Sequence, residues 1–136
     1  MGTWDIDAFG NDTACDWGYS LEDTNDLSLV ESTIDRVLAT GSDYLEVTDA
    51  EEALAAAEVI ARLQGNWGIR NAYTEPVDAW VERNQLTPSA ELVQKAHAAI
   101  DRIQTSPSEL LELWEESEMV DEWKQSVLDL RARVIL

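Results

Sequence analysis

The first 17 residues, MGTWDIDAFGNDTACDW, concentrate side chains that could do chemistry. They include two tryptophans, one phenylalanine and four aspartates, with no basic residue. Asp5, Asp7, Gly10 and Asp16 match positions of the calcium-loop pattern D-x-[DN]-x-[DN]-G-x5-E. Phe9, however, stands where a third oxygen ligand is needed, and an aspartate is too short for the bidentate glutamate at the end of the loop. We therefore assign no metal ligand here.

A structural interpretation accounts better for the same stretch. Asn11 or Asp12 is expected to cap a first helix that runs to about residue 23, because their side-chain oxygens accept bonds from unpaired N–H groups and negative charge is favourable at a helix N-terminus. We expect Trp4 and Phe9 to anchor residues 1–10 as an arm on the core. The helix should bury Ala14, Trp17 and Leu21, which recur at helical spacing.

The candidates for catalysis are few. His97 is the only histidine and stands four residues before Asp101, a spacing that could form an acid–base dyad, but no nucleophile accompanies it. The acidic neighbours of Cys15 should raise the pKa of its thiol and make it unreactive. Phosphate-loop, dinucleotide-binding, HExxH and GxSxG motifs do not occur in the sequence. We expect a protein that is not an enzyme and holds no cofactor.

An acidic run lies near the C-terminus, where seven carboxylates between Glu109 and Glu122 precede the first basic residue, Lys124. Glu109 is expected on the same helix face as the next glutamates, opposite Leu110, Leu113 and Trp114. A carboxylate-bridged metal site would need E-x-x-H motifs on other helices, which a chain with one histidine cannot supply. Two interpretations remain: a solvated face, or a docking face for a basic partner. Its candidate residues are Glu112, Glu115, Glu116, Glu118, Asp121 and Glu122.

Net charge restricts the partners further. The chain has 136 residues, with 28 acids against 9 bases and a net charge of −19. Such a chain lacks the basic footprint of a nucleic-acid-binding protein and is repelled by anionic membranes. A basic protein is the favoured partner, although solubility alone would also explain the charge. With one cysteine, no leader-like segment and no apolar span, we expect a cytoplasmic protein without disulfides.

Hydrophobic periodicity predicts helix almost throughout, and apolar residues make up 45% of the chain, enough for a core. Helix starts are predicted at Asp26 or Ser28, at Thr48 with Glu51, at Pro76, at Thr87 with Pro88, at Ser106 with Pro107 and Glu109, and at about Val120. Gly41 and Gly65 are expected to end two helices, and the alanine-rich helix between residues 48 and 65 should be central. Residues 66–75 read as a loop. The prediction is one all-α domain, residues 1–136, of six or seven short helices.

The sequence also resembles a family of bacterial proteins, DUF4259, a domain of unknown function. Its members open with a pattern like M-G-T-W-x-x-x-x-F-x-N-D-x-A-x-D-W, and the matching residues here are Trp4, Phe9, Asn11, Asp12, Ala14, Asp16 and Trp17. Residues 51–65 and 108–134 are similar to the family as well. Asp5 and Asp7 depart from it, since glycines are expected there. The resemblance implies a small helical protein of bacterial origin and no particular activity.

Two functional hypotheses follow. The first is a non-catalytic module that docks a basic partner, as immunity proteins and nucleic-acid mimics do, and it should show salt-sensitive association. The second is a metal- or small-molecule-binding protein that uses the Asp-rich arm, and it should be stabilised by its ligand. The oligomeric state is left open by the sequence.

Overall fold

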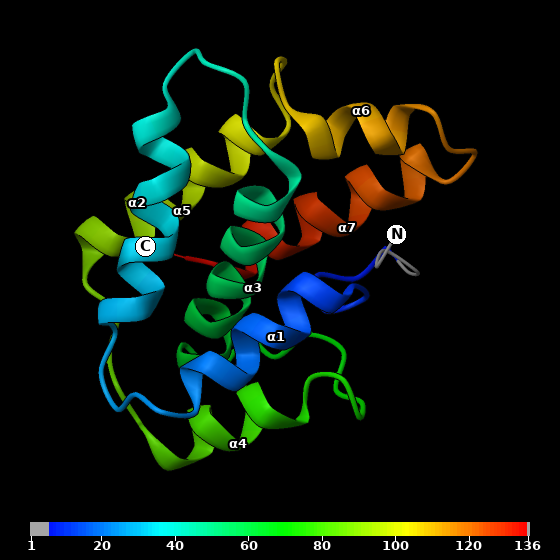
Figure 1. Cartoon of the computed structure of the whole chain (residues 1–136). Coiled ribbons are helices and arrows are strands. Elements are labelled where there is room, and N and C mark those ends of the chain that lie inside the picture. The colour runs from blue at the N-terminus through cyan, green and yellow to red at the C-terminus, as the bar shows by residue number, and fades with distance from the viewer. Residues whose placement is uncertain (1–5, 136) are drawn as a thin grey trace.

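A computed structural model describes residues 6–135, so the predicted anchor Trp4 and Asp5 lie outside the described residues. The described chain folds into seven α-helices and contains no strand (Figure 1). The helices are α1 (Asp12–Leu21), α2 (Ser28–Thr40), α3 (Val47–Leu63), α4 (Glu75–Arg83), α5 (Ala90–Ile103), α6 (Glu109–Glu115) and α7 (Val120–Arg133). The prediction of a single all-α domain is confirmed.

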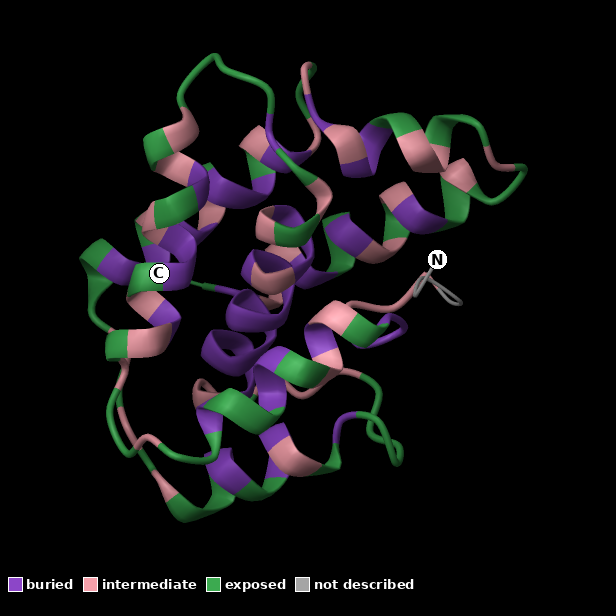
Figure 2. Cartoon of the chain, in the orientation of Figure 1, coloured by how far each residue is buried: buried purple, intermediate pink, exposed green. Residues whose placement is uncertain are grey.

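Helix α3 is the centre of the molecule, as its alanine content predicts. It contacts each of the other six helices, and Figure 2 shows it buried along most of its length. Small side chains such as Ala56 and Ala61, both 0% exposed, let the neighbouring helices approach its backbone closely. The side chains that surround this helix therefore form one continuous core.

The described part of the N-terminal arm packs against this core. Phe9 is 3% exposed, and Ile6 and Ala8 also contact the core. Asn11, rather than Asp12, is the N-cap of α1: its Oδ1 accepts a hydrogen bond of 2.7 Å from the backbone N–H of Ala14. The side-chain amide of Asn11 also donates to the carbonyl of Ala8 at 3.2 Å, so one residue holds both the arm and the helix start.

Two predicted capping boxes are wrong, for a common reason. Helix α3 begins at Val47, before Thr48, and α6 is capped by Ser108, which accepts from Leu111, instead of Ser106. The starts of α3 and α6 lie side by side, because Leu45 pairs with the backbone around Ser108. The carboxylate of Glu109 therefore accepts the N–H of Val47 at 2.8 Å, across the two helices, instead of capping its own.

Other helix ends are close to prediction. Asp26 accepts the N–H of Ser28 at 3.0 Å, and Gly41 and Gly65 both adopt positive φ after the helices they follow. Helix α5 is capped by Ser89 instead of opening at Thr87 with Pro88, and the predicted 66–75 loop ends one residue early, at the start of α4. None of the described helices is long and apolar enough to cross a membrane.

The cap of α1 makes a testable prediction. Asn11→Ala should lower the free energy of unfolding by about 1 kcal/mol, because the N–H of Ala14 loses its acceptor. Asn11→Ser, which keeps a capping oxygen, should recover most of that loss in urea denaturation. Equal stabilities for Asn11→Ala and the wild type would contradict the assignment of Asn11 as the cap.

Candidate functional site

The six predicted docking residues gather on the hairpin of α6 and α7, and all six are exposed. We call Glu112, Glu115, Glu116, Glu118, Asp121 and Glu122 the acidic hairpin. None of them forms an ion pair with a basic side chain of residues 6–135. Glu109, predicted to share their face, is half-buried instead because its carboxylate binds the N-terminus of α3.

Some carboxylates elsewhere on the molecule are paired with basic side chains. Lys95 alone contacts three of them, at 3.1–3.7 Å. Arg36 contacts Asp49 and Glu52, and Arg131 binds Asp101. The acidic hairpin is therefore a region where negative charge is left without compensation by the described part of the chain.

A pair of aromatic rings fixes the two arms of the hairpin. Trp114 of α6 and Trp123 of α7 stack with their ring centroids 5.9 Å apart and their planes 9° from parallel. Trp123 is 2% exposed, so the stacked pair connects the hairpin to the core. At its base the hydroxyl of Tyr44 donates to Glu112 at 3.2 Å. Partial desolvation, this hydrogen bond and the nearby carboxylates raise the pKa of the Tyr44 phenol.

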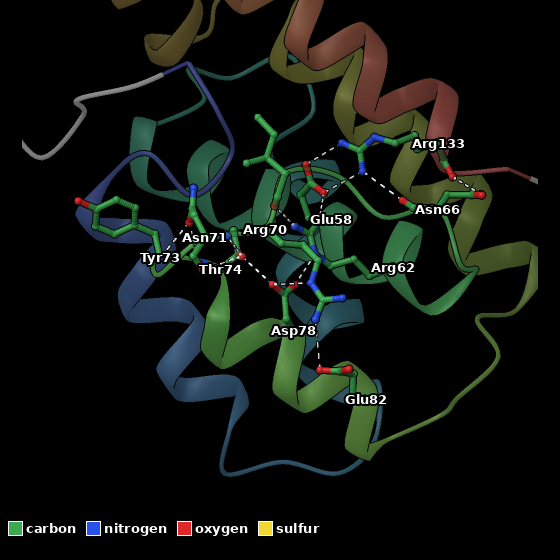
Figure 3. Close-up of polar contacts among 11 residues, drawn as sticks. Glu58, Arg62, Asn66, Arg70, Asn71, Tyr73, Thr74, Asp78, Glu82 and Arg133 are labelled. Atoms are coloured by element: carbon green, nitrogen blue, oxygen red, sulfur yellow. Dashed lines mark hydrogen bonds and ion pairs between the residues drawn. The ribbon is translucent and has the colours of Figure 1, made fainter.

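A second constellation, which our sequence interpretation missed, lies in the interior (Figure 3). Arg62 of α3 is 2% exposed and pairs with Glu58 one turn earlier on the same helix. Its Nε donates to Asp78 of α4 at 2.8 Å, and its third nitrogen donates to the carbonyl of Ile69 at 2.7 Å. Asp78 also accepts from the hydroxyl of Thr74 at 2.6 Å. We call Glu58, Arg62, Asp78 and Arg133 the buried charge network.

Arg133 joins α7 to this network. Its two terminal nitrogens donate to the two carboxylate oxygens of Glu58 at 3.0 and 2.9 Å, and its Nε donates to Asp129 at 3.0 Å. Burial opposes the charge of Arg133, but its carboxylate partners outweigh that effect and raise its pKa. A Cβ at Gly68 would lie 2.9 Å from this guanidinium, so the absence of a side chain there lets the 66–70 segment approach Arg133.

Aromatic rings complete the surroundings of the arginines. The guanidinium of Arg62 lies 5.9 Å from the ring centroid of Phe9 and 5.8 Å from that of Trp67. Among the described residues, every buried side-chain nitrogen and oxygen has a hydrogen-bond partner. A cleft of about 100 Å³ lies beside the network, yet the charges that line it already bind one another. The arrangement is suited to holding the fold together.

A signal for this network was present in the sequence. The stretch AAAEVIARL is apolar except for Glu58 and Arg62, which stand four residues apart. A glutamate and an arginine at this spacing can pair along a helix, and on a helix that is apolar all round such a pair must be buried. Asp78 and Arg133 could not be found in this way, because they come from distant segments.

The remaining catalytic candidates from the sequence are the pair of His97 and Asp101 and the thiol of Cys15. Asp101 binds Arg131 at 2.8 and 3.0 Å, while Nε2 of His97 contacts the carbonyl of Val134, so the two residues form no dyad. Burial and then the charges of Asp12 and Asp16 raise the pKa of Cys15, in the predicted direction.

The Asp-rich stretch does not have the shape of a calcium loop. Phe9 points into the core, and the second half of the template, ending at Asp16, lies within α1. Within residues 6–135, no three His, Cys, Asp or Glu side chains come together in a way that could hold a metal ion.

Comparison with protein families gives one match, to the domain of unknown function DUF4259, over residues 2–126. The chain belongs to this family. No curated protein and no solved structure matches it. Among the N-terminal residues that resemble the family pattern, Phe9 lies beside Arg62, Asn11 caps α1, and the indole N–H of Trp17 donates to Thr33 at 2.9 Å. Asp12 and Asp16 are exposed on α1.

The buried network predicts a large difference between two carboxylates on one helix. Asp78→Asn should lower the free energy of unfolding by about 3 kcal/mol, because it removes one of the two carboxylates that pair with buried Arg62 and leaves Glu58 shared between two arginines. Glu82→Gln, which removes an exposed carboxylate 3.3 Å from Arg70, should change it by less than about 1 kcal/mol. Urea denaturation of both variants measures the difference, and equal effects would show that the network does not stabilise the fold.

The arm makes a prediction about calcium. The melting temperature should be the same in millimolar calcium as in magnesium at the same ionic strength. The reason is that the residues of the calcium-loop pattern from Asp12 onward are helical and cannot form the loop. Thermal unfolding followed by circular dichroism measures this. A calcium-specific rise of several degrees that Asp7→Asn abolishes would contradict our interpretation.

Proposed function

We propose that this protein is a non-catalytic binding module that docks a basic protein partner through the acidic hairpin, in the manner of immunity proteins or nucleic-acid mimics. One observation supports this most directly. Six exposed carboxylates without a cationic partner among the described residues lie on a hairpin that a stacked tryptophan pair holds in one geometry. A fixed array of like charge speeds the approach of an oppositely charged surface and selects its orientation.

Folding gives no reason for two of these charges. Glu112 lies in the first turn of α6, and Asp121 and Glu122 lie in the first turn of α7, where a negative charge is favourable. Glu115 and Glu116 lie at the C-terminal end of α6, where a negative charge is unfavourable. Like charges three or four residues apart on a helix also reduce stability, by about 0.2–0.5 kcal/mol per pair. Charges that oppose the fold, as those of Glu115 and Glu116 do, are consistent with selection for binding or for solubility.

A triple variant separates binding from solubility. Glu115→Gln, Glu116→Gln and Glu122→Gln together should leave the free energy of unfolding unchanged or slightly raised. With the partner, the association rate should fall by about tenfold at low ionic strength and by much less at high ionic strength, because screening removes the steering. Capture from the native host at low salt identifies partners, and stopped-flow measurements at two salt concentrations give the rates.

The matched control removes three carboxylates from another face. Glu31→Gln, Asp35→Asn and Glu91→Gln change the net charge equally, but these residues surround Lys95 on α2 and α5. The control should bind its partner nearly as fast as the wild type. If both triple variants slow association equally, net charge alone is responsible. If neither does, or if no captured protein distinguishes them, the hairpin is not a docking face.

A further inference from the structure

A groove lies between α1 and α4, away from the acidic hairpin (Figure 1). It has a volume of about 350 Å³ and is lined by Tyr19, Glu22, Ala72, Glu75, Pro76 and Ala79. Tyr19 is 60% exposed, so the face of its ring is open to a ligand. Glu22 and Glu75 are exposed and form no ion pair within residues 6–135.

The walls of this groove are held in place by buried contacts. Gly18 lies where a Cβ would come within 3.1 Å of the Val77 side chain, so its lack of a side chain allows α1 and α4 to approach closely. The indole N–H of Trp80, which is 0% exposed, donates to the carbonyl of Thr24 at 2.7 Å and fixes the end of α1 against α4. Tyr19 and Glu22 therefore keep a fixed position opposite Glu75 and Pro76.

The neighbouring face of α4 shows what such a set of side chains binds. Arg70 lies over the ring of Trp67 at 4.2 Å, with Asp78 at 3.5 Å and Glu82 at 3.3 Å. One aromatic ring and two carboxylates thus hold a guanidinium that is half exposed to solvent. The groove presents the same combination, Tyr19 with Glu22 and Glu75, and no cation of the described chain enters it.

We propose that the α1–α4 groove binds an arginine side chain of a partner polypeptide. The guanidinium stacks on the ring of Tyr19 and pairs with the carboxylates of Glu22 and Glu75. The aliphatic stem of the arginine lies against Pro76 and Ala79. Asp16, three residues before Tyr19 on the same face of α1, and Asp23, just after the end of this helix, extend the negative potential of this region. This site requires neither the acidic hairpin nor its partner.

Nuclear magnetic resonance titration of the full chain with Nα-acetyl-arginine amide tests this site. We expect saturable shifts of the backbone amides of residues 18–22 and 72–79, with a dissociation constant in the millimolar range. Nα-acetyl-citrulline amide, the uncharged analogue, should leave them unshifted. Tyr19→Ala should weaken binding about threefold to tenfold, and Tyr19→Phe, which keeps the ring, by less than about twofold.

Charge controls separate this site from the acidic hairpin. Glu22→Gln with Glu75→Gln should weaken binding of the probe by about tenfold, whereas Asp121→Asn with Glu122→Gln, an equal change in charge on the hairpin, should leave it unchanged. Equal shifts with citrulline would overturn the proposal. Shifts spread over all acidic surfaces and insensitive to Tyr19→Ala would also overturn it, without bearing on the hairpin and its protein partner.

Discussion

The buried guanidinium of Arg62 is the constraint on which the rest of the structure depends. A charge in the middle of an apolar helix is strongly destabilising unless it is paired and fully hydrogen-bonded. Its partners come from three places: Glu58 on its own helix, the carbonyl of Ile69 in the loop that follows, and Asp78 on α4. The loop and α4 must therefore dock on α3, and Glu58, shared with Arg133, draws in α7 as well. The ring of Phe9 brings the N-terminal arm to the same point.

This constraint also shapes the surface. The chain has 9 basic residues for 28 acidic ones, and the interior uses several of them. Arg62 and Arg133 belong to the buried network, and Arg102 donates to the carbonyls of Gly41, Asp43, Thr105 and Pro107, which joins two loops. The six other basic residues are too few to neutralise the carboxylates of the surface. The carboxylates of the acidic hairpin and of the α1–α4 groove therefore stay uncompensated within the described chain, while those near Lys95 do not.

The sequence predicted those features of the fold that depend on interactions between residues close together in the chain. Six or seven helices, a cap at Asn11 or Asp12 and the central position of α3 were predicted from spacing, cap residues and alanine content, which act within a few residues of each other. The structure has seven helices among the described residues and the cap at Asn11. Features that depend on distant segments were missed. Glu109 caps α3 because the starts of α3 and α6 meet in space, and Asp78 and Arg133 reach Arg62 and Glu58 only after α4 and α7 have packed. The exposure of each acidic hairpin residue could be predicted because an exposed charge needs no partner, while the docking role of these residues stays a prediction.

Uncompensated charge alone does not distinguish a binding surface from one that serves solubility, but a fixed backbone beneath the charges favours the proposed binding. Solubility requires only that carboxylates face water, and it is indifferent to their spacing. Recognition requires groups to be held in one geometry before the partner arrives, because ordering them during association reduces affinity. Both acidic regions meet this condition: stacked Trp114 and Trp123 hold the hairpin, and the hydrogen bond from Trp80 to Thr24 holds the groove. The two regions lie on different sides of α3 (Figure 1). One basic partner can therefore contact both regions, or two partners can each contact one. Two weak contacts on one rigid body combine into a stronger one when a single partner spans both.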